Sequence, residues 1–400
     1  VMTMADNKDK KVLNVPALRF PEFTEEWREY AIGNVLSIGN GRDYKHLHNG
    51  DIPVFGTGGY MTSVDDFLYD GESVFIGRKG TINKPLYYNG KFWTVDTLFY
   101  THSFVNVLPK FAYCLFQTIN WLKYNEASGV PSLSKATIEK IKVRVPSMDE
   151  QGKLSNQLFL LDKRIEVQNK IIEKYESLIQ AMCDTLIGKK TQQVMLSFND
   201  FGESYSGLSG KSAEDFGEGS PYITYMNVYQ NQIIDITDIG LVKINKTEQQ
   251  SLVQYGDILF TLSSETPEEV GMGAVYLGET YPLYLNSFCF GIHITDESKI
   301  FPPFLAYYVS SESFRKAVFP LAQGSTRFNL QKGDFLKKVF PFPAIEQQRK
   351  IYSILKTYSD KLNIEKQMIK LLCCQKQYLL RQLFISLIPQ HYYKIFFLST

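Results

Sequence analysis

The sequence predicts an α+β fold in which two mixed α/β modules are separated by two long helices that pair as an antiparallel coiled coil. Three observations lead to this fold. First, the phrase "PSMDEQGKL" at Pro146–Leu154 returns as "PAIEQQRKI" at Pro343–Ile351, 197 positions later in a chain of 400 residues. Second, each phrase opens a long stretch with apolar residues at alternating spacings of four and three. Third, shorter landmarks upstream pair in the same order, which indicates an internal duplication with pseudo-two-fold symmetry.

The first long stretch has a seam of ten positions that one face of a coiled-coil helix would present. They are Leu154, Leu158, Leu161, Ile165, Gln168, Ile172, Tyr175, Ile179, Met182 and Leu186. The second seam, 197 positions on, is Ile351, Leu355, Tyr358, Leu362, Glu365, Ile369, Leu372, Lys376, Leu379 and Leu383. The polar layer at Gln168 thus recurs as Glu365. Ser147 and Glu150 match the S-x-x-E capping box at the start of the first helix, and Gly188 is expected to end it.

The landmarks before the helices show that the duplication covers the modules as well. They are "DGESVF" (Asp70–Phe75) with "YGDILF" (Tyr255–Phe260), "VDTLFY" (Val95–Tyr100) with "LNSFCF" (Leu285–Phe290), "FAY" (Phe111–Tyr113) with "LAY" (Leu305–Tyr307), and Gly129 with Gly324. The offset rises steadily from 185 to 197, as collinear duplication with small insertions requires. We therefore expect a first module at 14–146, a first spacer helix at 147–190, a second module at 191–343 and a second spacer helix at 344–388. The alternative is two unrelated amphipathic helices, each packed on its own module.

Within the modules, short β-branched and aromatic runs broken by Gly, Asn and Asp predict strands and turns. The runs are "GESVFIG", "PLYYNGKFWTV", "SPYITYMNV", "GDILFTL" and "AVYLGETYPLYLN". Asn89-Gly90 is typical of a hairpin turn.

Composition limits the classes of function. The chain is 44% hydrophobic and 14% aromatic, which is ample for folded cores. No run in the sequence reaches 18 apolar residues, so we expect no membrane span. The first fifteen residues are polar and lack the apolar core of a signal peptide. The five cysteines have no CxxC spacing, which favours reduced thiols in a cytoplasmic protein and argues against a zinc site. The net charge is +1, but acidic residues exceed basic ones by seven in residues 191–343.

Two stretches resemble catalytic motifs and lack a required residue. "YSGLSGKS" ends in Gly210-Lys211-Ser212 like a phosphate-binding loop, but Tyr205 stands where that loop needs its first glycine. "IFPPF" resembles the Asn/Asp-Pro-Pro-aromatic motif of amino methyltransferases, but Phe301 cannot accept a hydrogen bond from a target amine. We expect a polar loop at the first stretch and prolines that open a helix at the second.

No other stretch predicts chemistry. "FGTGG" at Phe55–Gly59 precedes no periodic helix, so we expect a turn there. His46 and His48 lie in a polar stretch without acidic or cysteine partners at ligand spacing, so we expect them to be solvated. The sequence therefore predicts no catalytic residue, no metal site and no cofactor, which favours a binding protein. Two modules on paired rods would hold a fixed spacing, which matters most on DNA.

The combination of motifs resembles the specificity subunit of type I restriction–modification systems. The resemblance rests on "NVPALRFPEFTEEW" (Asn14–Trp27), "DGESVFIGRKGTINKPLYYNGKFWTVDTLFY", "GDILFTLSSETPEEVGMG" and the two long helices, and it runs from about residue 14 to about residue 385. The tail "SLIPQHYYKIFFLST" does not match the segment expected after the second helix in that family.

The resemblance implies that each module is a target-recognition domain that reads one half of a bipartite, asymmetric site on double-stranded DNA. It implies that the helices set the spacing and dock two methyltransferase subunits, and that motor–nuclease subunits join the complex. The specificity subunit itself would not be catalytic. The acidic second module is unusual for a DNA-binding protein, so we expect the chain alone to bind DNA poorly.

We expect the DNA contacts at loop tips that carry basic or hydrogen-bonding side chains. The candidates are Arg78, Lys79, Thr81, Ser263, Ser264, Glu265, Thr326 and Arg327. At offset 185, Arg78-Lys79 falls on Ser263-Ser264, so the same loop would read different bases in the two modules. Alternatively, Arg78 pairs with Asp70 or Glu72, or binds a phosphate. At the level of the whole chain, the alternative is a non-catalytic coiled-coil scaffold whose two modules bind proteins.

Overall fold

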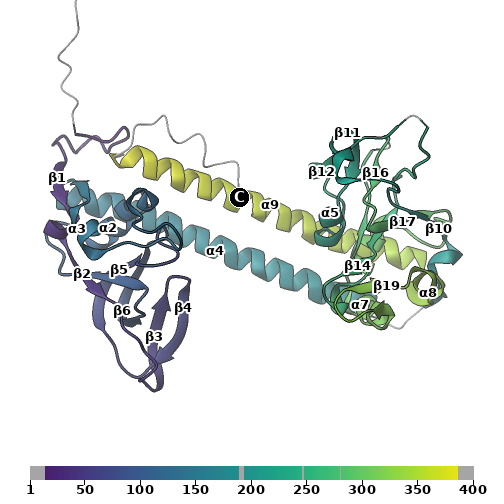
Figure 1. Cartoon of the computed structure of the whole chain (residues 1–400), viewed down its shortest axis with the longest axis horizontal. Helices are drawn as coiled ribbons and strands as arrows, with labels where there is room; N and C mark the ends of the chain where they lie inside the picture. The colour runs from purple at the N-terminus through teal and green to yellow at the C-terminus, as the bar shows by residue number, and fades with distance from the viewer. Residues whose placement is uncertain (1–13, 189–192, 246, 280, 386–400) are drawn as a thin grey trace, which may run out of the picture. The chain divides into compact units, whose positions relative to one another are not determined.

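The computed structural model describes residues 14–188, 193–245, 247–279 and 281–385. These residues form two compact units. The first unit combines the chain up to residue 169 with the chain from residue 367 onward, and the second comprises residues 170–366. Each unit therefore contains one globular module together with parts of both long helices (Figure 1).

The first unit is built on a six-stranded sheet with the strand order β2-β7-β5-β6-β3-β4. Its strands are β2 (Ser37–Asn40), β3 (Asn49–Gly56), β4 (Gly59–Val64), β5 (Tyr69–Gly77), β6 (Leu86–Thr94) and β7 (Leu98–His102). β5 pairs antiparallel with β6 and β7, whereas β3 pairs parallel with β6. The predicted strands "GESVFIG" and "PLYYNGKFWTV" are thus confirmed as β5 and β6.

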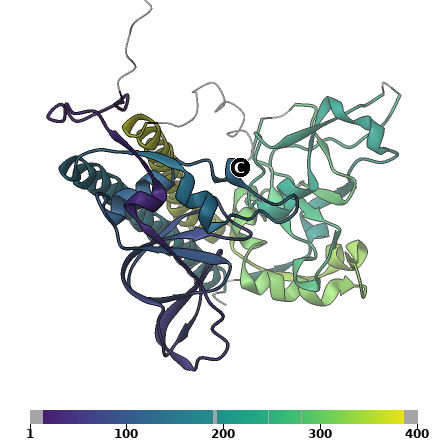
Figure 2. The same ribbon diagram turned by 60° about the vertical axis from the view of Figure 1, so that its left-hand side comes forward.

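Helices and a second small sheet complete this unit (Figure 2). They are β1 (Arg28–Ala31), α1 (Ile32–Val35), α2 (Pro109–Phe116), the 3₁₀ helix η1 (Trp121–Tyr124), α3 (Lys135–Lys140) and β8 (Lys142–Val145), with β1 antiparallel to β8. The segment before β1 joins the ends of both long helices. Trp27 packs on Phe384, and Arg19 makes a bidentate ion pair at 2.8 and 2.7 Å with the buried carboxylate of Glu150.

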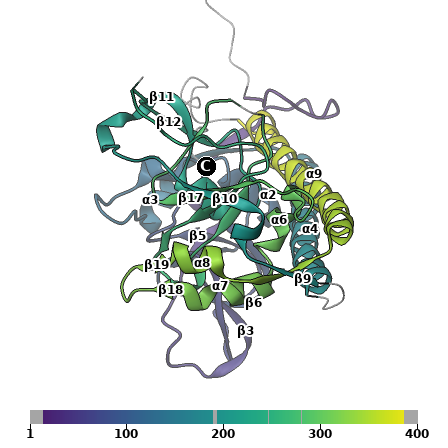
Figure 3. The same ribbon diagram turned by 90° about the vertical axis from the view of Figure 1, so that its right-hand side faces the viewer.

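The second unit contains four small sheets, with strand orders β10-β17-β13-β15, β12-β11-β16, β14-β19-β18 and β20-β9 (Figure 3). The strands are β9 (Gln193–Leu196), β10 (Gly202–Ser206), β11 (Phe216–Ile223), β12 (Ile239–Val242), β13 (Ile258–Thr261), β14 (Ser263–Ser264), β15 (Gly273–Val275), β16 (Tyr284–Leu285), β17 (Cys289–Ile294), β18 (Ala322–Gln323), β19 (Phe328–Leu330) and β20 (Phe340–Pro343). The helices are α5 (Tyr225–Gln230), α6 (Pro302–Tyr308), α7 (Glu312–Val318) and α8 (Lys332–Lys337), with short 3₁₀ helices between. A phenylalanine-rich core joins β13, β17, α6, α7 and α8.

The two long helices are α4 (Met148–Ile187) and α9 (Ile345–Leu383). In the first unit, the early part of α4 packs against the late part of α9, with Leu158 and Leu383 in one core and an ion pair of 2.5 Å between Asp162 and Lys376. In the second unit, the late part of α4 packs against the early part of α9, through residues such as Cys183 and Leu355. The pairing is antiparallel within each unit, as predicted.

The predicted seams are confirmed, because all twenty seam positions are buried or half-buried. Gln168 and Glu365 both fall in the middle third of their helices. Gly188 follows the last residue of α4, as expected. The predicted capping box is only half present. The backbone N–H of Glu150 donates to Ser147 Oγ at 3.4 Å, but the Glu150 carboxylate accepts from Arg19 instead of closing the box.

Strand register supports the internal duplication. β5 pairs antiparallel with β7 in the first module, and β13 pairs antiparallel with β17 in the second, so the landmarks on these strands are hydrogen-bonded neighbours in both modules. Both "FAY" and "LAY" lie in short helices, α2 and α6, that begin with proline. α3 and α8 follow at the offset of 197. The two modules therefore share one hydrogen-bonded framework, which excludes two unrelated halves.

Two local predictions were wrong. Asn89-Gly90 is not a hairpin turn, because it lies inside β6, where Gly90 faces Gly71 and both glycines have positive φ. The second half of "SPYITYMNV" is helical, because the Thr224 side chain caps α5 by accepting from the backbone N–H of Asn227. The expected turn at "FGTGG" is confirmed between β3 and β4. The expected boundaries 147–190 and 344–388 extend into residues 189–190 and 386–388, outside the described ranges.

Candidate functional site

The loop after β5 carries the predicted residues of the first module. Its backbone is held on both sides. Arg78 N–H donates to the carbonyl of Thr97 at 2.8 Å, Leu133 N–H donates to the carbonyl of Arg78 at 2.9 Å, and Lys79 forms an isolated β-bridge with Ser132. This loop is therefore a rigid platform between two other segments.

The side chains of this platform are accessible. Arg78 and Lys79 are exposed, and Thr81 is half-buried. The Arg78 guanidinium makes one long hydrogen bond, at 3.4 Å to the carbonyl of Asp96, and lies 5.9 Å from the Phe99 ring centroid. Within the described ranges it has no carboxylate partner, and Glu72 instead accepts from the Tyr87 hydroxyl. The expected alternative of an ion pair with Asp70 or Glu72 is not observed.

The corresponding loop of the second module starts one residue earlier than the sequence offset predicts. Leu262 N–H donates to the carbonyl of Phe288 at 2.9 Å, and Leu330 N–H donates to the carbonyl of Leu262 at 2.8 Å. These bonds match those that Arg78 makes with Thr97 and Leu133. Leu262, and not Ser263, therefore occupies the position of Arg78.

This shift is accompanied by burial of the two predicted serines. Ser263 and Ser264 are only 5% and 6% exposed, because β14 pairs with β19 and the Tyr225 hydroxyl donates to the Ser263 carbonyl. Ser264 Oγ donates to the Glu269 carboxylate at 3.2 Å. Both serine side chains are thus enclosed inside the module, and we assign them no direct contact with bases. Glu265, the next residue, is exposed.

Thr326 and Arg327 lie in the tight connection between β18 and β19, and both are exposed. Gly324 begins this turn with φ +143°, and a Cβ there would stand 2.0 Å from the carbonyl oxygen of Arg327. A side chain at position 324 would therefore displace Arg327. The Arg327 guanidinium lies 5.8 Å from the Phe288 ring centroid, which places a cation beside an aromatic ring at the loop tip.

Arg315 was missed by the sequence prediction. It is largely buried on α7, and its guanidinium donates at 2.7 Å to the backbone carbonyls of Glu268, Val270 and Gly271. Burial lowers the pKa of Arg315 from its usual value. Its five N–H donors form a planar fork that suits several carbonyls at once. Arg315 thus fixes the segment that follows Glu265, and only the folded chain brings the two together.

The two motif-like stretches have structural roles. Lys211 of "GKS" is buried and pairs with Glu248 at 2.5 Å, and Ser212 caps a three-residue 3₁₀ helix. Phe301 precedes the prolines that open α6, as expected, and packs against Tyr352. Among the described residues, no three His, Cys, Asp or Glu side chains gather as a metal site requires. Within the same ranges, every helix is too short or too polar to cross a lipid bilayer.

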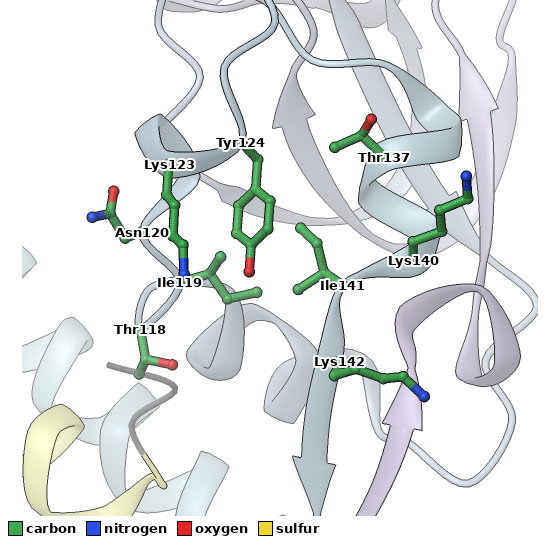
Figure 4. Close-up of a pocket in the computed structure, with 9 residues that line it drawn as sticks. All are labelled: Thr118, Ile119, Asn120, Lys123, Tyr124, Thr137, Lys140, Ile141 and Lys142. Atoms are coloured by element: carbon green, nitrogen blue, oxygen red, sulfur yellow. The ribbon is translucent and has the colours of Figure 1, made fainter. Parts of the chain in front are cut away.

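A hollow of about 440 Å³ in the first unit is lined by three lysines (Figure 4). Tyr124 lies in its middle, beside Ile119 and Ile141, whereas the amino groups of Lys140 and Lys142 point away from it. Two of the three lysines therefore turn their amino groups away from the hollow, and the three do not converge on an anion. We assign no ligand to it.

Comparison with known proteins supports the fold and the family. The chain is 24% identical over 382 residues to the type I restriction enzyme MjaVIII specificity subunit of Methanocaldococcus jannaschii, covering 88% of this chain and 84% of that protein. It superposes on the crystal structure of a type I restriction–modification S subunit from M. genitalium with a TM-score of 0.61 and 16% identity, covering 94% of this chain and 100% of that one. A chain from a structural study of assembly and conformational transition of the type I R-M system gives a TM-score of 0.53 with 13% identity, covering 88% of this chain and 96% of that one.

The sequence model of the type I restriction modification DNA specificity domain matches the chain twice, at residues 24–177 and 195–372. The two matches cover most of the chain and correspond to its two halves. Together with the shared framework of the two modules, they establish that the chain belongs to the type I restriction modification DNA specificity family.

Proposed function

We propose that each module of this chain reads one half of a bipartite, asymmetric DNA site, and that α4 and α9 set the spacing and dock two methyltransferase subunits. Specificity subunits are DNA-recognition proteins of type I restriction–modification systems and are not themselves catalytic, and the chain is one of this family. The finer assignments rest on the geometry of the loops and on the surfaces of the helices. Motor–nuclease subunits would join through the same complex.

One observation carries the proposal of two different half-sites. The same hydrogen-bonded loop presents exposed Arg78 and Lys79 in the first module, but Leu262 and buried Ser263 in the second. The two modules thus keep the same loop backbone but present different side chains on it. Two modules that recognise different base sequences need such a difference. Arg78 can donate to both major-groove acceptors of guanine, and Lys79 can neutralise a phosphate. The Thr81 hydroxyl can form a hydrogen bond with a base edge or with a phosphate.

In the second module, the proposed contacts move to Glu265, Thr326 and Arg327. A glutamate can accept from the amino group of cytosine, and an arginine can donate to guanine. A base-reading carboxylate also accounts for part of the acidic character of this module. Since phosphate neutralisation supplies much of DNA affinity, the methyltransferase subunits would contribute the rest.

The long helices keep apolar residues outside their seams, which supports docking of a partner. The large exposed ones are Met148, Leu160, Val167, Leu178, Ile354, Ile364, Met368, Leu371 and Tyr378. In the first unit, Leu160 borders a hollow of about 920 Å³ formed with the aromatic rings of Tyr87, Tyr113 and Phe159. Exposed apolar surface of this kind marks protein interfaces.

The test is methylation by the chain assembled with its methyltransferase subunits, mapped on random DNA. We expect a bipartite site with a fixed gap. Insertion of a few residues around Gly188–Gln193, a segment whose residues 189–192 lie outside the described ranges, should lengthen the gap and leave both half-sites unchanged. New bases with the old gap would contradict the roles given to modules and helices. A complex that forms but shows no sequence preference would favour the protein-binding scaffold.

The isolated chain gives a second test of the same proposal. It should neither methylate nor cleave DNA nor hydrolyse ATP, because Phe301 and Tyr205 stand where the relevant motifs need other residues. Turnover that copurifies with the chain alone, at constant specific activity through successive columns, would overturn it.

A further inference from the structure

An exposed phenylalanine lies beside Arg327, one of the proposed reading residues of the second module. Phe288 is 55% exposed and sits in the turn between β16 and β17. The turn is held by its own atoms: the Phe288 N–H donates to Asn286 Oδ1 at 2.9 Å, and the Cys289 N–H donates to the Asn286 carbonyl at 3.0 Å. The backbone of the turn is therefore held in place, and the ring that it carries is exposed to solvent.

The same turn exists in the first module. There the Leu98 N–H donates to the carbonyl of Val95 at 2.9 Å, and the carbonyl of Thr97 accepts from Arg78 as that of Phe288 accepts from Leu262. Thr97 and Phe288 thus occupy one position of the shared framework, beside the loop proposed to contact DNA. One module carries a half-buried threonine at this position, and the other carries an exposed aromatic ring.

The position of Arg327 next to Phe288 indicates which DNA groups the ring can contact. The Arg327 guanidinium lies 5.8 Å from the ring centroid, so the two side chains form a cation–π pair. Such a pair favours conformations in which the guanidinium stays beside the ring. In the major groove, an arginine donates to guanine O6 and N7, and an apolar side chain contacts the C5-methyl group of thymine.

We propose that Phe288 contacts the methyl group of a thymine next to the guanine read by Arg327. The second module would then recognise a thymine–guanine step through one paired unit of two side chains. This inference rests on the proposed function, and it adds a specificity-determining residue and the chemical group that it recognises. It requires that the half-site of the second module contain a thymine beside a guanine.

The experiment uses the assembled complex and its mapped site. Each thymine of both half-sites is replaced in turn by deoxyuridine, which removes only the methyl group, and binding is measured. One replacement, in a single half-site, should weaken binding by about three- to fivefold, the factor that one buried methyl group contributes. The Phe288→Ala variant should be insensitive to that replacement and should bind the unmodified site more weakly than the wild type.

Two controls separate this contact from general effects. Phe319→Ala removes another exposed phenylalanine of the same unit and should keep the wild-type response to deoxyuridine. Arg327→Ala should weaken the preference for guanine at the position next to the thymine whose methyl group affects binding. If the complex reads a bipartite site but no thymine methyl matters, or if Phe288→Ala retains the response, the inference is wrong and the proposed function stands. If no bipartite site exists, both fail.

Discussion

Gln151 and Gln348 make the same three hydrogen bonds in the two units, although 197 positions separate them in the chain. Gln151 Oε1 accepts from the N–H of Leu108 at 2.8 Å, and its Nε2 donates to the carbonyls of Asn106 and Pro146 at 3.0 Å. Gln348 repeats this with Phe301 at 2.9 Å, Lys299 at 3.0 Å and Pro343 at 2.9 Å. The repeated phrase is therefore a joint that ties a long helix to its module.

The first prediction concerns the strength of this joint. Gln348→Leu should lower the free energy of unfolding by about 2–4 kcal/mol, because it leaves a buried N–H and two carbonyls without partners. Gln347→Leu is a matched control, since Gln347 is exposed on the same helical turn and should change stability by less than about 0.5 kcal/mol. Denaturant unfolding of both variants provides the measurement. Equal effects of the two substitutions would show that the joint contributes nothing specific.

The second prediction concerns Arg78. If the guanidinium reads a base, Arg78→Ala should weaken DNA binding by the assembled complex by about 1–3 kcal/mol. It should also reduce the preference for one base at a single position of the site. If the guanidinium binds a phosphate, the affinity should fall equally for all DNA sequences, and it should depend less steeply on salt concentration. Arg28→Ala, at an exposed position on β1, is the control. Binding to the site and its single-base variants at two salt concentrations distinguishes the outcomes, and an unchanged profile would remove Arg78 from the interface.

The third prediction concerns Arg315 as a positioning residue. Arg315→Lys keeps the charge but cannot supply a planar fork to three carbonyls, so the segment Glu265–Gly271 should loosen. We expect faster amide exchange there and relaxed base preference in the second half-site alone. Lys316→Ala, which removes an exposed partner of Glu312, should leave both unchanged. A loss of stability without any change in base preference would reduce Arg315 to a structural residue.

The fourth prediction uses the thiols to test docking. Burial raises the pKa of Cys114 and Cys183 to about 12 and raises that of Cys289 as well, whereas Cys373 and Cys374 are exposed. Near pH 8 the three buried thiols stay protonated and shielded, so two of the five should react rapidly with a thiol reagent in the native chain.

Assembly should then protect Cys374. It lies at helical spacing between Leu371 and Tyr378, on the exposed apolar face of α9 that we propose for a methyltransferase subunit. In the Cys374→Ser variant only Cys373 reacts rapidly, so comparison with the wild type shows which of the two thiols assembly protects. Full reactivity of Cys374 within the assembled complex would place the partner on another face.

The sequence by itself determined the long helices and the duplication. The seams of α4 and α9 follow from a spacing of three and four residues, which is a local property of the chain. The prolines that open α2 and α6, and the β-branched runs of β5 and β13, are local signals of the same kind. The order of the landmarks then established that one module occurs twice.

Only the tertiary structure decided which loop residues are accessible. Strand pairing between β14 and β19 buried Ser263 and Ser264. The hydrogen bonds that Leu262 donates to Phe288 and accepts from Leu330 placed Leu262 at the position of Arg78. Asn89-Gly90 became part of β6 because its partner strand continues past it. Arg315 met the carbonyls of a segment more than forty residues away. Burial and register depend on contacts between segments distant in sequence, and no local pattern records them.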